Sequence, residues 1–425
     1  MSVEYIFPNS ADVREISAQL AHIGAIEAAR AAQEGASLPS VYWAEIREIA
    51  ESGLAKAHFT AGDQFVDKYT DPDGSAHTIY QNPWDVMDFR EVEKHDGTKV
   101  PGIIIGTHYT QLVAMQFSGW QALIYSETGL PAGTYNFTVP SAWGSKGLVA
   151  GTYQFTLTQP LPAGGQIVGV KRWPDVDIST WTVASYASAT STTAIETVAV
   201  TAGSEGTALG AAQMVVPGDT TTVAIDGTDY TYRLNGIHQA AYGYNRWKYS
   251  AVRQYLNSDL PAGEWWKPQH VFDRAPDVAA TKAGWLAGVP DEFKNALTPI
   301  KVLTAPPSAI ATAEGITFDV TYDKVFLPSL QEHYINNQGA GEGEAWEYWK
   351  EINGTETVWP QYKATDELKV YQISNHANAP YRWLRSASRG YGYSVWYVYP
   401  SGGVYYGGSG AAYDSLTLAP ACAIC

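Results

Sequence analysis

From His58 onward, short runs of alternating apolar and polar residues are separated by Gly, Pro and Asp, as in "VPGIIIGTHYTQLVAMQFSGWQALIYSE". Alternation with a period of two gives a β-strand two different faces, and the intervening residues are those that turns require. A chain with this pattern over much of its length is not an all-helical protein. We therefore expect strands to dominate its fold.

Two segments before this region have helical spacing. Residues 11–34 carry a stripe of apolar residues three and four positions apart, and Trp43, Ile46 and Ile49 resume the spacing after a break. The first stripe is close to a heptad seam. Residues 1–57 are therefore expected to form helices that attach or oligomerise the chain, or that pack against its own body.

An internal echo marks a separate β-rich region. The segment "AGTYNFTV" at 132–139 returns as "AGTYQFTL" at 150–157. Two strands so similar and so close in sequence are expected to be neighbours in a small β-sandwich. We therefore interpret residues 131–230 as a β-rich insertion that divides a larger domain into 58–130 and 231–425.

The C-terminal half mixes helices with strands. Helices are expected in "NRWKYSAVRQYLNSD", with Asn245 as the N-cap, and in "PDEFKNALTP". The segment "DKVFLPSLQEHYINN" is expected to join a short strand to a helix, and residues from Tyr381 on to form strands and turns. The expected fold class is α+β. The residues expected on the inner face of the first helix are Trp247, Val252, Tyr255 and Leu256.

Net charge excludes some partners. With 27 Lys and Arg against 43 Asp and Glu, the formal charge is −16. A nucleic acid or an anionic membrane would be repelled, so neither is an expected partner. The start of the chain lacks a basic segment followed by an apolar run, so we expect no signal peptide. No window approaches about eighteen apolar residues, so no membrane insertion is expected.

No catalytic constellation is visible. The sequence contains no HExxH, no GxSxG and no glycine-rich phosphate loop, so we expect no enzymatic activity, no cofactor and no metal site. His270 and His333 are interpreted as structural residues. The segment "GEGEAWEYWKE" is expected to be a solvated acidic loop that leads into an amphipathic helix. Its acidic residues are Glu342, Glu344, Glu347 and Glu351.

The only cysteines, Cys422 and Cys425, form "CAIC" at the end of a strand-like run. A redox pair would be expected at the start of a helix, and a zinc site would need a second pair of ligands from another chain. We interpret them as two small thiols, buried or terminal, and leave their redox state open.

The tail has an unusual concentration of Tyr, Gly and Ser. The segment "SVWYVYPSGGVYY" predicts a hairpin, with Tyr397 and Tyr399 on one face and Trp396 and Val398 on the other. One face of the hairpin is expected to pack in the core and the other to be exposed to solvent. The following "GGSGAAYDS" has the composition of antibody loops, in which Tyr supplies rigid contact area. An exposed binding surface and a buried subunit interface both fit this composition.

Three motifs together carry a family resemblance. They are "NRWKYSAVRQYLNS" (245–258), "DKVFLPSLQE" (323–332) and "YRWLRSASRG…WYV…GGV…LAPACAI" (381–424). They resemble the C-type-lectin-like domain of gut-bacterial prophage proteins, many of which are the variable proteins of diversity-generating retroelements. The resemblance covers most of residues 58–425. It implies a C-type-lectin-like fold, shared with formylglycine-generating enzymes, that carries the β-rich insertion and the N-terminal helices.

The resemblance also implies a division of the tail. In such systems a reverse transcriptase copies a template repeat with errors at adenines, so that Asn codons become Tyr, Ser, Gly or Asp. The implied variable, ligand-binding positions are Tyr391, Gly392, Tyr393, Tyr399, Gly403, Tyr406, Gly407, Ser409, Tyr413 and Asp414. The implied scaffold positions are Leu384, Arg385, Ser386, Ala387, Trp396, Val398, Val404, Pro420 and Cys422.

These observations predict a phage or prophage receptor-binding protein with a diversifiable tail. Its ligand would be a bacterial cell-surface protein or glycan, a trimer is plausible, and it would be found in the virion or, before assembly, in the bacterial cytoplasm. Two alternatives remain. The chain could be a structural or decoration protein of a phage particle with a fixed surface. A formylglycine-generating-type enzyme is the weaker alternative, because that activity needs an internal cysteine site.

Overall fold

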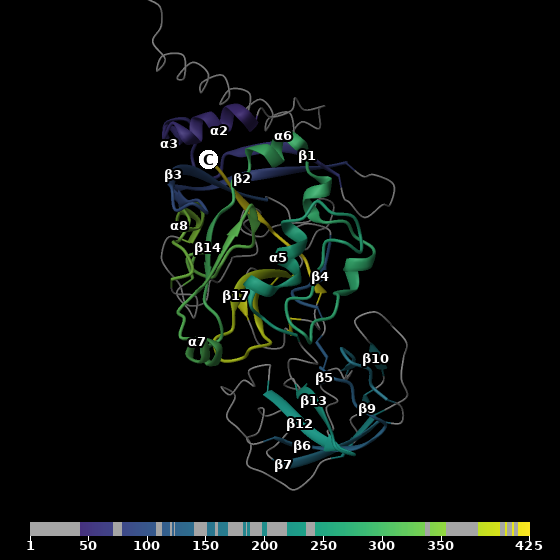
Figure 1. Ribbon diagram of the computed structural model, residues 1–425. Coiled ribbons are helices and arrows are strands. Elements are labelled where there is room, and N and C mark those ends of the chain that lie inside the picture. Colours follow the sequence, from purple (N-terminus) through teal and green to yellow (C-terminus); the bar gives the residue numbers. More distant parts are fainter. Residues whose placement is uncertain are drawn as a thin grey trace, which may run out of the picture.

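The computed structural model confirms an α+β protein whose sheets are antiparallel (Figure 1). The predicted helix 11–34 lies outside the described residues. None of the helices in the described part of the chain is long and apolar enough to cross a membrane. The structure describes residues 43–70, 79–107, 113–119, 121–122, 124–139, 151–157, 160–168, 182–183, 185–187, 198–201, 219–234, 243–335, 341–353, 381–399, 404–405, 410–411 and 415–425.

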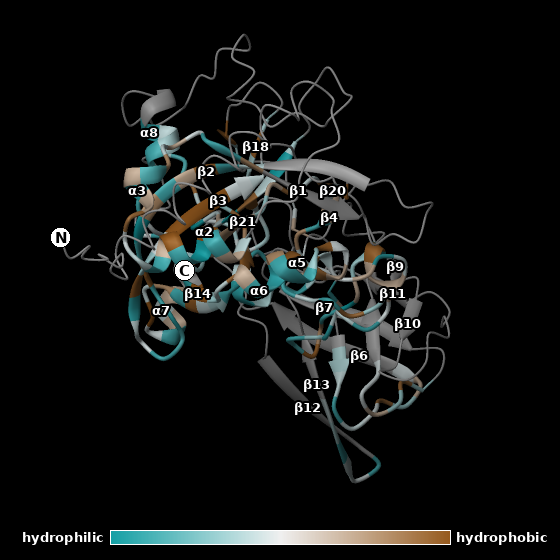
Figure 2. Ribbon diagram, turned by 90° about the horizontal axis from the view of Figure 1, so that it is seen from above, coloured by the Kyte–Doolittle hydropathy of each residue, from teal (hydrophilic) through white to brown (hydrophobic). Residues whose placement is uncertain are grey.

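The main sheet has the strand order β1-β2-β3-β21-β16, so the last strand of the chain lies inside it. β3 is one of the most hydrophobic segments in Figure 2, and Ile103, Ile104 and Ile105 are all buried because both of its faces are covered. The strands of this sheet are β1 (Gln64–Thr70), β2 (Ile79–Glu93), β3 (Lys99–Thr107), β16 (Val325–Phe326) and β21 (Ala421–Ile424).

Helix α2 (Trp43–Glu51) packs against the body of the chain, beside the C-terminal end (Figure 1). The apolar residues of its predicted stripe are buried. The ring of Trp43 lies 4.3 Å from that of Phe293 and 5.8 Å from that of Phe65. The short α3 (Ala55–His58) follows. Over the described residues, the N-terminal segment therefore belongs to the main hydrophobic core.

The C-terminal half confirms the helices predicted within 245–259 and 290–299 but changes their ends. The four residues expected on one helix face are all buried, Val252, Tyr255 and Leu256 on helix α5 (Ala251–Leu256) and Trp247 on the preceding 3-10 helix η2 (Trp247–Tyr249). The N-cap of α5 is Ser250, whose hydroxyl accepts a hydrogen bond from the Arg253 amide, so the prediction of Asn245 as the cap is wrong. The remaining helical elements are η3 (Asp277–Ala280), η4 (Trp285–Gly288), α6 (Asp291–Ala296), α7 (Ser308–Glu314) and α8 (Glu347–Asn353).

Residues 330–334 form turns, so the helix predicted after β16 is wrong. The Ser329 and Glu332 side chains bond each other's backbone amides as in a capping box, which begins a helical turn. The chain leaves the helical conformation at Tyr334, whose φ is +61°, so the turn does not continue into a helix. Before β16, a separate ribbon joins β14 (Ile300–Thr304) to β15 (Asp319–Asp323).

The tail forms a second sheet, β17-β18-β19. The pairing of Val398 with Val404 confirms the predicted hairpin. The prediction of a solvent-exposed face is wrong for β18, because Trp396 and Val398 enter one core cluster while Val395 and Tyr397 enter the main one. The strands of the tail are β17 (Arg382–Ala387), β18 (Val395–Val398), β19 (Val404–Tyr405) and β20 (Ser415–Leu416), the last of which pairs with β4 (Met115–Gln116).

The two echoed segments are neighbouring strands, as predicted, with Tyr135 opposite Phe155. The β-rich region lies at one end of the molecule, away from α2 (Figure 1), and β5 adds a strand from before residue 131. One of its sheets holds β5 (Ile124–Ser126), β8 (Gln166–Val168), β10 (Ser185–Ala187), β12 (Asp219–Ile225) and β13 (Thr228–Leu234). The other holds β6 (Gly133–Val139), β7 (Gly151–Leu157), β9 (Thr182–Val183) and β11 (Val198–Thr201).

Candidate ligand-binding surface

Four tyrosines gather at one end of the tail sheet, and we call them the tyrosine cluster: Tyr381, Tyr397, Tyr399 and Tyr405. The Tyr399 ring lies 5.2 Å from those of Tyr381 and Tyr397, and 6.0 Å from that of Tyr405. Tyr381 is 43% exposed and Tyr405 39%. The cluster thus forms one connected aromatic surface that is open to solvent at both ends.

The core beneath holds the cluster in place. Tyr397 is almost fully buried, and its ring meets the Trp383 ring edge to face at 6.4 Å. The indole nitrogen of Trp383 donates a 2.8 Å hydrogen bond to the Met115 carbonyl. Buried tyrosines anchored in this way lose little entropy when a ligand binds, and their exposed neighbours offer both apolar area and hydroxyl groups.

The turn between β17 and β18 carries a second tyrosine pair. The rings of Tyr391 and Tyr393 lie 5.8 Å apart, and burial raises the pKa of Tyr393 to about 12. Asn245 holds this turn. Its backbone amide donates to the Gly392 carbonyl at 3.1 Å, and its side-chain amide donates to the carbonyls of Tyr391 and Ser394, each at 2.7 Å.

The structure divides the predicted variable positions. Tyr391, Gly392 and Tyr393 lie together in this turn, whereas Tyr399 lies beyond the other end of β18, a strand about 13 Å long. Sequence reasoning missed Tyr381 and Tyr405 as members of the cluster. Because the hairpin pairs Tyr405 with Tyr397, the predicted strand pairing was the signal that could have found Tyr405. The predicted positions outside the described residues are Gly403, Tyr406, Gly407, Ser409, Tyr413 and Asp414.

All the predicted scaffold positions are buried. Four of them pack with Leu330 and Ile335 in a small core cluster beneath the hairpin. These four are Leu384, Trp396, Val398 and Val404. The others are Arg385, Ser386, Ala387, Pro420 and Cys422, which lie on β17 or on β21 and its approach.

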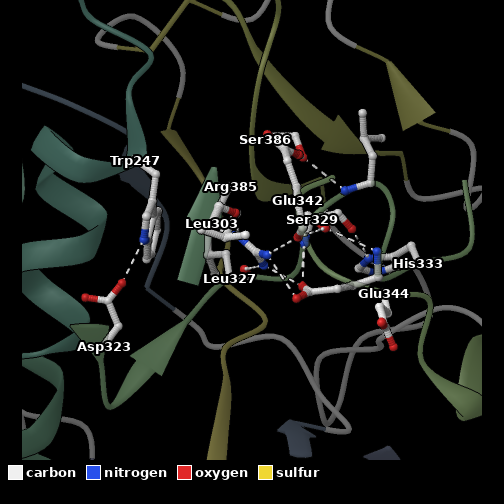
Figure 3. A network of polar contacts seen from close by, with 12 residues as sticks. Trp247, Leu303, Asp323, Leu327, Ser329, His333, Glu342, Glu344, Arg385 and Ser386 are labelled. Carbon is white, nitrogen blue, oxygen red and sulfur yellow. Dashed lines mark hydrogen bonds and ion pairs between the residues drawn. The ribbon is translucent and has the colours of Figure 1, made fainter. Parts of the chain in front are cut away.

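A buried polar network is centred on Arg385 of β17 and joins the tail sheet to the segments around Ser329 and Glu342 (Figure 3). Arg385 is 1% exposed, and its guanidinium meets both carboxylate oxygens of Glu332, one of them at 2.9 Å. It also donates to the carbonyls of Leu327 at 2.8 Å, Glu342 at 2.5 Å and Leu303 at 3.4 Å. All five guanidinium N–H groups are therefore used within the protein.

The expected solvation of the acidic loop is wrong for Glu342, which is 1% exposed. Its carboxylate accepts a 2.8 Å hydrogen bond from the Ala305 amide and a short one from the Ser386 hydroxyl. Burial raises the pKa of Glu342 to about 7, against the lowering effect of these bonds and of Arg385. No local pattern distinguishes Glu342 from Glu344, because its partners come from distant segments.

Both histidines are packed against aromatic rings. His333 is buried and stacks on Trp349 at 4.7 Å, and its Nδ1 lies 3.1 Å from the Ser329 carbonyl. Burial lowers its pKa to about 3, so the ring is neutral. His270 meets the ring of Tyr249 at 4.6 Å, and burial lowers its pKa as well. These contacts fit the structural role expected for both residues.

The two cysteines are free and buried, and burial raises the pKa of both thiols. Cys422 lies on β21 and Cys425 directly follows it. Residues three apart along a strand point to opposite faces with Cα atoms about 10 Å apart, too far for a disulfide. Within the described ranges, no group of three or more His, Cys, Asp or Glu could hold a metal ion.

Comparison with known proteins gives one match. Residues 224–424, just under half of the chain, match a family model described as a domain of unknown function (DUF6273). No curated protein and no solved structure matches the chain. The matched segment contains the tyrosine cluster, the Asn245 turn and the Arg385 network, so these features lie within one family-defined unit.

Proposed function

We propose that the chain is a ligand-binding protein with a C-type-lectin-like body, and that the tyrosine cluster is part of its binding surface. The observation that carries the proposal is the unbroken ring contact between two exposed tyrosines, Tyr381 and Tyr405, through Tyr399. Of the six exposed large hydrophobic side chains among the described residues, two belong to this cluster. Grouped, exposed aromatic residues on a packed support are typical of interaction sites.

We further propose that the surface is diversified and recognises a protein or glycan on a bacterial cell, in a phage or prophage receptor-binding protein of trimeric assembly. The support is the resemblance of the tail to retroelement variable proteins and its content of Tyr, Gly, Ser and Asp. The scaffold of the hairpin is buried, and three of the four described variable positions, Tyr391, Tyr393 and Tyr399, are half-buried and reach the surface, whereas Gly392 is buried.

Binding is tested by incubating the labelled full chain with a panel of bacterial cells and measuring retained label. The double variant Tyr381→Ala/Tyr405→Ala is expected to lose about tenfold or more in affinity, because aromatic anchors dominate binding energy. The matched control is Leu260→Ala, which removes an equally exposed apolar side chain elsewhere. Equal binding by both variants, or no binding to any cell, contradicts the proposal.

Diversification is tested separately, by sequencing the DNA that flanks the gene. A near-copy of the tail codons that differs only at adenines, beside a reverse-transcriptase gene, is the expected finding. It would identify the variable residues directly. Absence of both would leave a binding protein with a fixed surface.

The second candidate is a structural or decoration protein whose tyrosines are buried between copies. The same exposed cluster favours it, since aromatic residues are enriched in subunit interfaces too. Chemical nitration of Tyr405 distinguishes the two candidates, because an interface would protect it in the assembled oligomer. The burial of both cysteines gives the formylglycine-generating alternative no support.

A further inference from the structure

A cleft of about 540 Å³ lies between β2 and β14, on a different part of the molecule from the tyrosine cluster. Four consecutive residues of each strand line it, 90–93 of β2 and 300–303 of β14. Because successive side chains alternate between the faces of a strand, a pocket against a face is lined by every second residue. Lining by consecutive residues indicates that the cleft reaches the backbone edges of both strands, while Ile104 of β3 and Phe326 of β16 line its deeper part.

The two strands meet at one point and then separate. Lys94 forms an isolated antiparallel bridge with Ile300, and the described structure shows no further pairing between β2 and β14. On the same edge of β2, pairing with β1 ends at Asp85. Residues 88–93 of β2 are therefore paired with β3 alone over the described part of the chain.

The register shows which main-chain groups point into the cleft. Lys94 N–H donates to Thr98 in the turn that leads from β2 to β3, and hydrogen-bonded pairs alternate with non-bonded pairs from there along the antiparallel ladder. Glu91 faces Pro101, which has no N–H, so this pair is non-bonded. The N–H and C=O of Glu91 therefore point away from β3, toward β14.

Most charged groups around the cleft are paired, and the exception among the described residues is the exposed carboxylate of Glu344. Lys301 binds both carboxylate oxygens of Glu93, at 3.0 and 3.1 Å, and Lys99 lies 3.3 Å from Glu91. Arg385 also lines the cleft and has all its N–H groups occupied within the protein. The cleft thus offers unpaired main-chain groups and no unpaired cation to a ligand. This chemistry recognises an extended backbone rather than a charged small molecule.

We propose that this cleft binds an extended peptide segment of a partner protein, which adds a strand along the edge of β2 at Glu91. The lined length of β2 matches about four peptide residues, or ~13 Å. Because most of the charges around the cleft are paired with one another, the main chain supplies most of the recognition. The proposal is independent of the tyrosine cluster and of the function proposed for it.

Hydrogen exchange of the free full-length chain tests the premise. The Glu91 amide is expected to exchange about 100-fold faster than the Val92 amide, which bonds to β3. Saturation with the peptide that binds best from an array of short random peptides should slow exchange of the Glu91 amide and leave exchange of the Val92 amide unchanged. A Glu91 amide that is already as protected as Val92 would mean that a segment of this chain fills the cleft, which overturns the proposal.

Binding is tested on an array of short random peptides. Glu91→Pro removes the outward N–H without breaking a bond to β3, and Glu91→Ala is the matched control that keeps it. The best array peptide should bind Glu91→Pro about fivefold or more weakly and Glu91→Ala about as well as the unaltered chain. The variant Tyr381→Ala/Tyr405→Ala should bind normally. Equal affinity of both Glu91 variants, or an array with no bound peptide, refutes the proposal.

Discussion

The side-chain amide of Asn245 donates a 2.7 Å hydrogen bond to the backbone carbonyl of Tyr391, which lies 146 positions further along the chain. The same amide group holds the Ser394 carbonyl at 2.7 Å. A turn whose carbonyls are fixed by a buried donor has its shape set before any ligand arrives. A ligand that binds this turn would gain affinity because the turn is already ordered, and not because Asn245 adds contacts to the ligand.

Asn245→Ala is therefore expected to destabilise the protein by about 2–4 kcal/mol, because it leaves buried carbonyls without donors. Asn245→Asp should cost at least as much, since a carboxylate would face those same carbonyls. Urea denaturation measures both changes. The control is Asn295→Ala at an exposed position on α6, which should change the unfolding free energy by less than about 0.5 kcal/mol. Similar values for Asn245 and Asn295 would contradict the role given to this amide.

Glu332→Gln is expected to cost about 3–5 kcal/mol of unfolding free energy, because it leaves the buried charge of Arg385 without its carboxylate partner. The exposed pair of Arg47 and Glu51, 2.9 Å apart on α2, provides the control. Glu51→Gln should cost less than about 1 kcal/mol, since solvent screens that pair. If the two variants lose equal stability, the buried network does not hold the tail sheet as described.

Local pattern explains what could be predicted. The echoed segments share length and alternation, so the pairing of β6 with β7 followed from the sequence. The buried face of α5 could be predicted for the same reason, because its apolar residues recur at helical spacing within one short segment. Asn245 is a residue type that is common at N-caps, but its side chain bonds to a turn far away in the sequence. In the sequence Glu342 cannot be told from other acidic loop residues, because its partners Ser386 and Ala305 come from distant segments. Contacts between distant segments leave no trace in local spacing, and neither does the insertion of β21 between β3 and β16.

Gly119 has a packing requirement that no turn pattern reveals. A Cβ atom there would lie 1.6 Å from the Arg274 carbonyl oxygen, a backbone atom that cannot rotate away. Gly119→Ala should therefore cost about 3 kcal/mol or more. The control is Gly390→Ala, where the added carbon meets no atom within 4 Å and should cost less than about 1 kcal/mol. Thermal unfolding compares the two, and a mild effect at Gly119 would show that the loops separate easily.

The raised pKa of Glu342 sets the direction of one pH effect. Its pKa is about 7 in the folded protein and near its ordinary value of 4.5 in the unfolded chain. Below pH 4.5 the carboxyl is protonated in both states. Between 4.5 and 7 the unfolded chain releases the proton and the folded protein retains it, so stability from this group is lost as pH rises. His333 acts in the opposite direction, since its lowered pKa removes stability as pH falls below about 6.5.

Glu342→Gln separates these two effects, because His333 is the same in both proteins. The amide stays neutral and can still bond to Ala305 and Ser386. Relative to the unaltered chain, the variant should gain about 2 kcal/mol of unfolding free energy between pH 5 and pH 8, as urea denaturation at each pH would measure. The exposed control Glu48→Gln should show no such gain. A constant difference between Glu342→Gln and the unaltered chain would mean that Glu342 is already ionised at pH 5 in the folded protein.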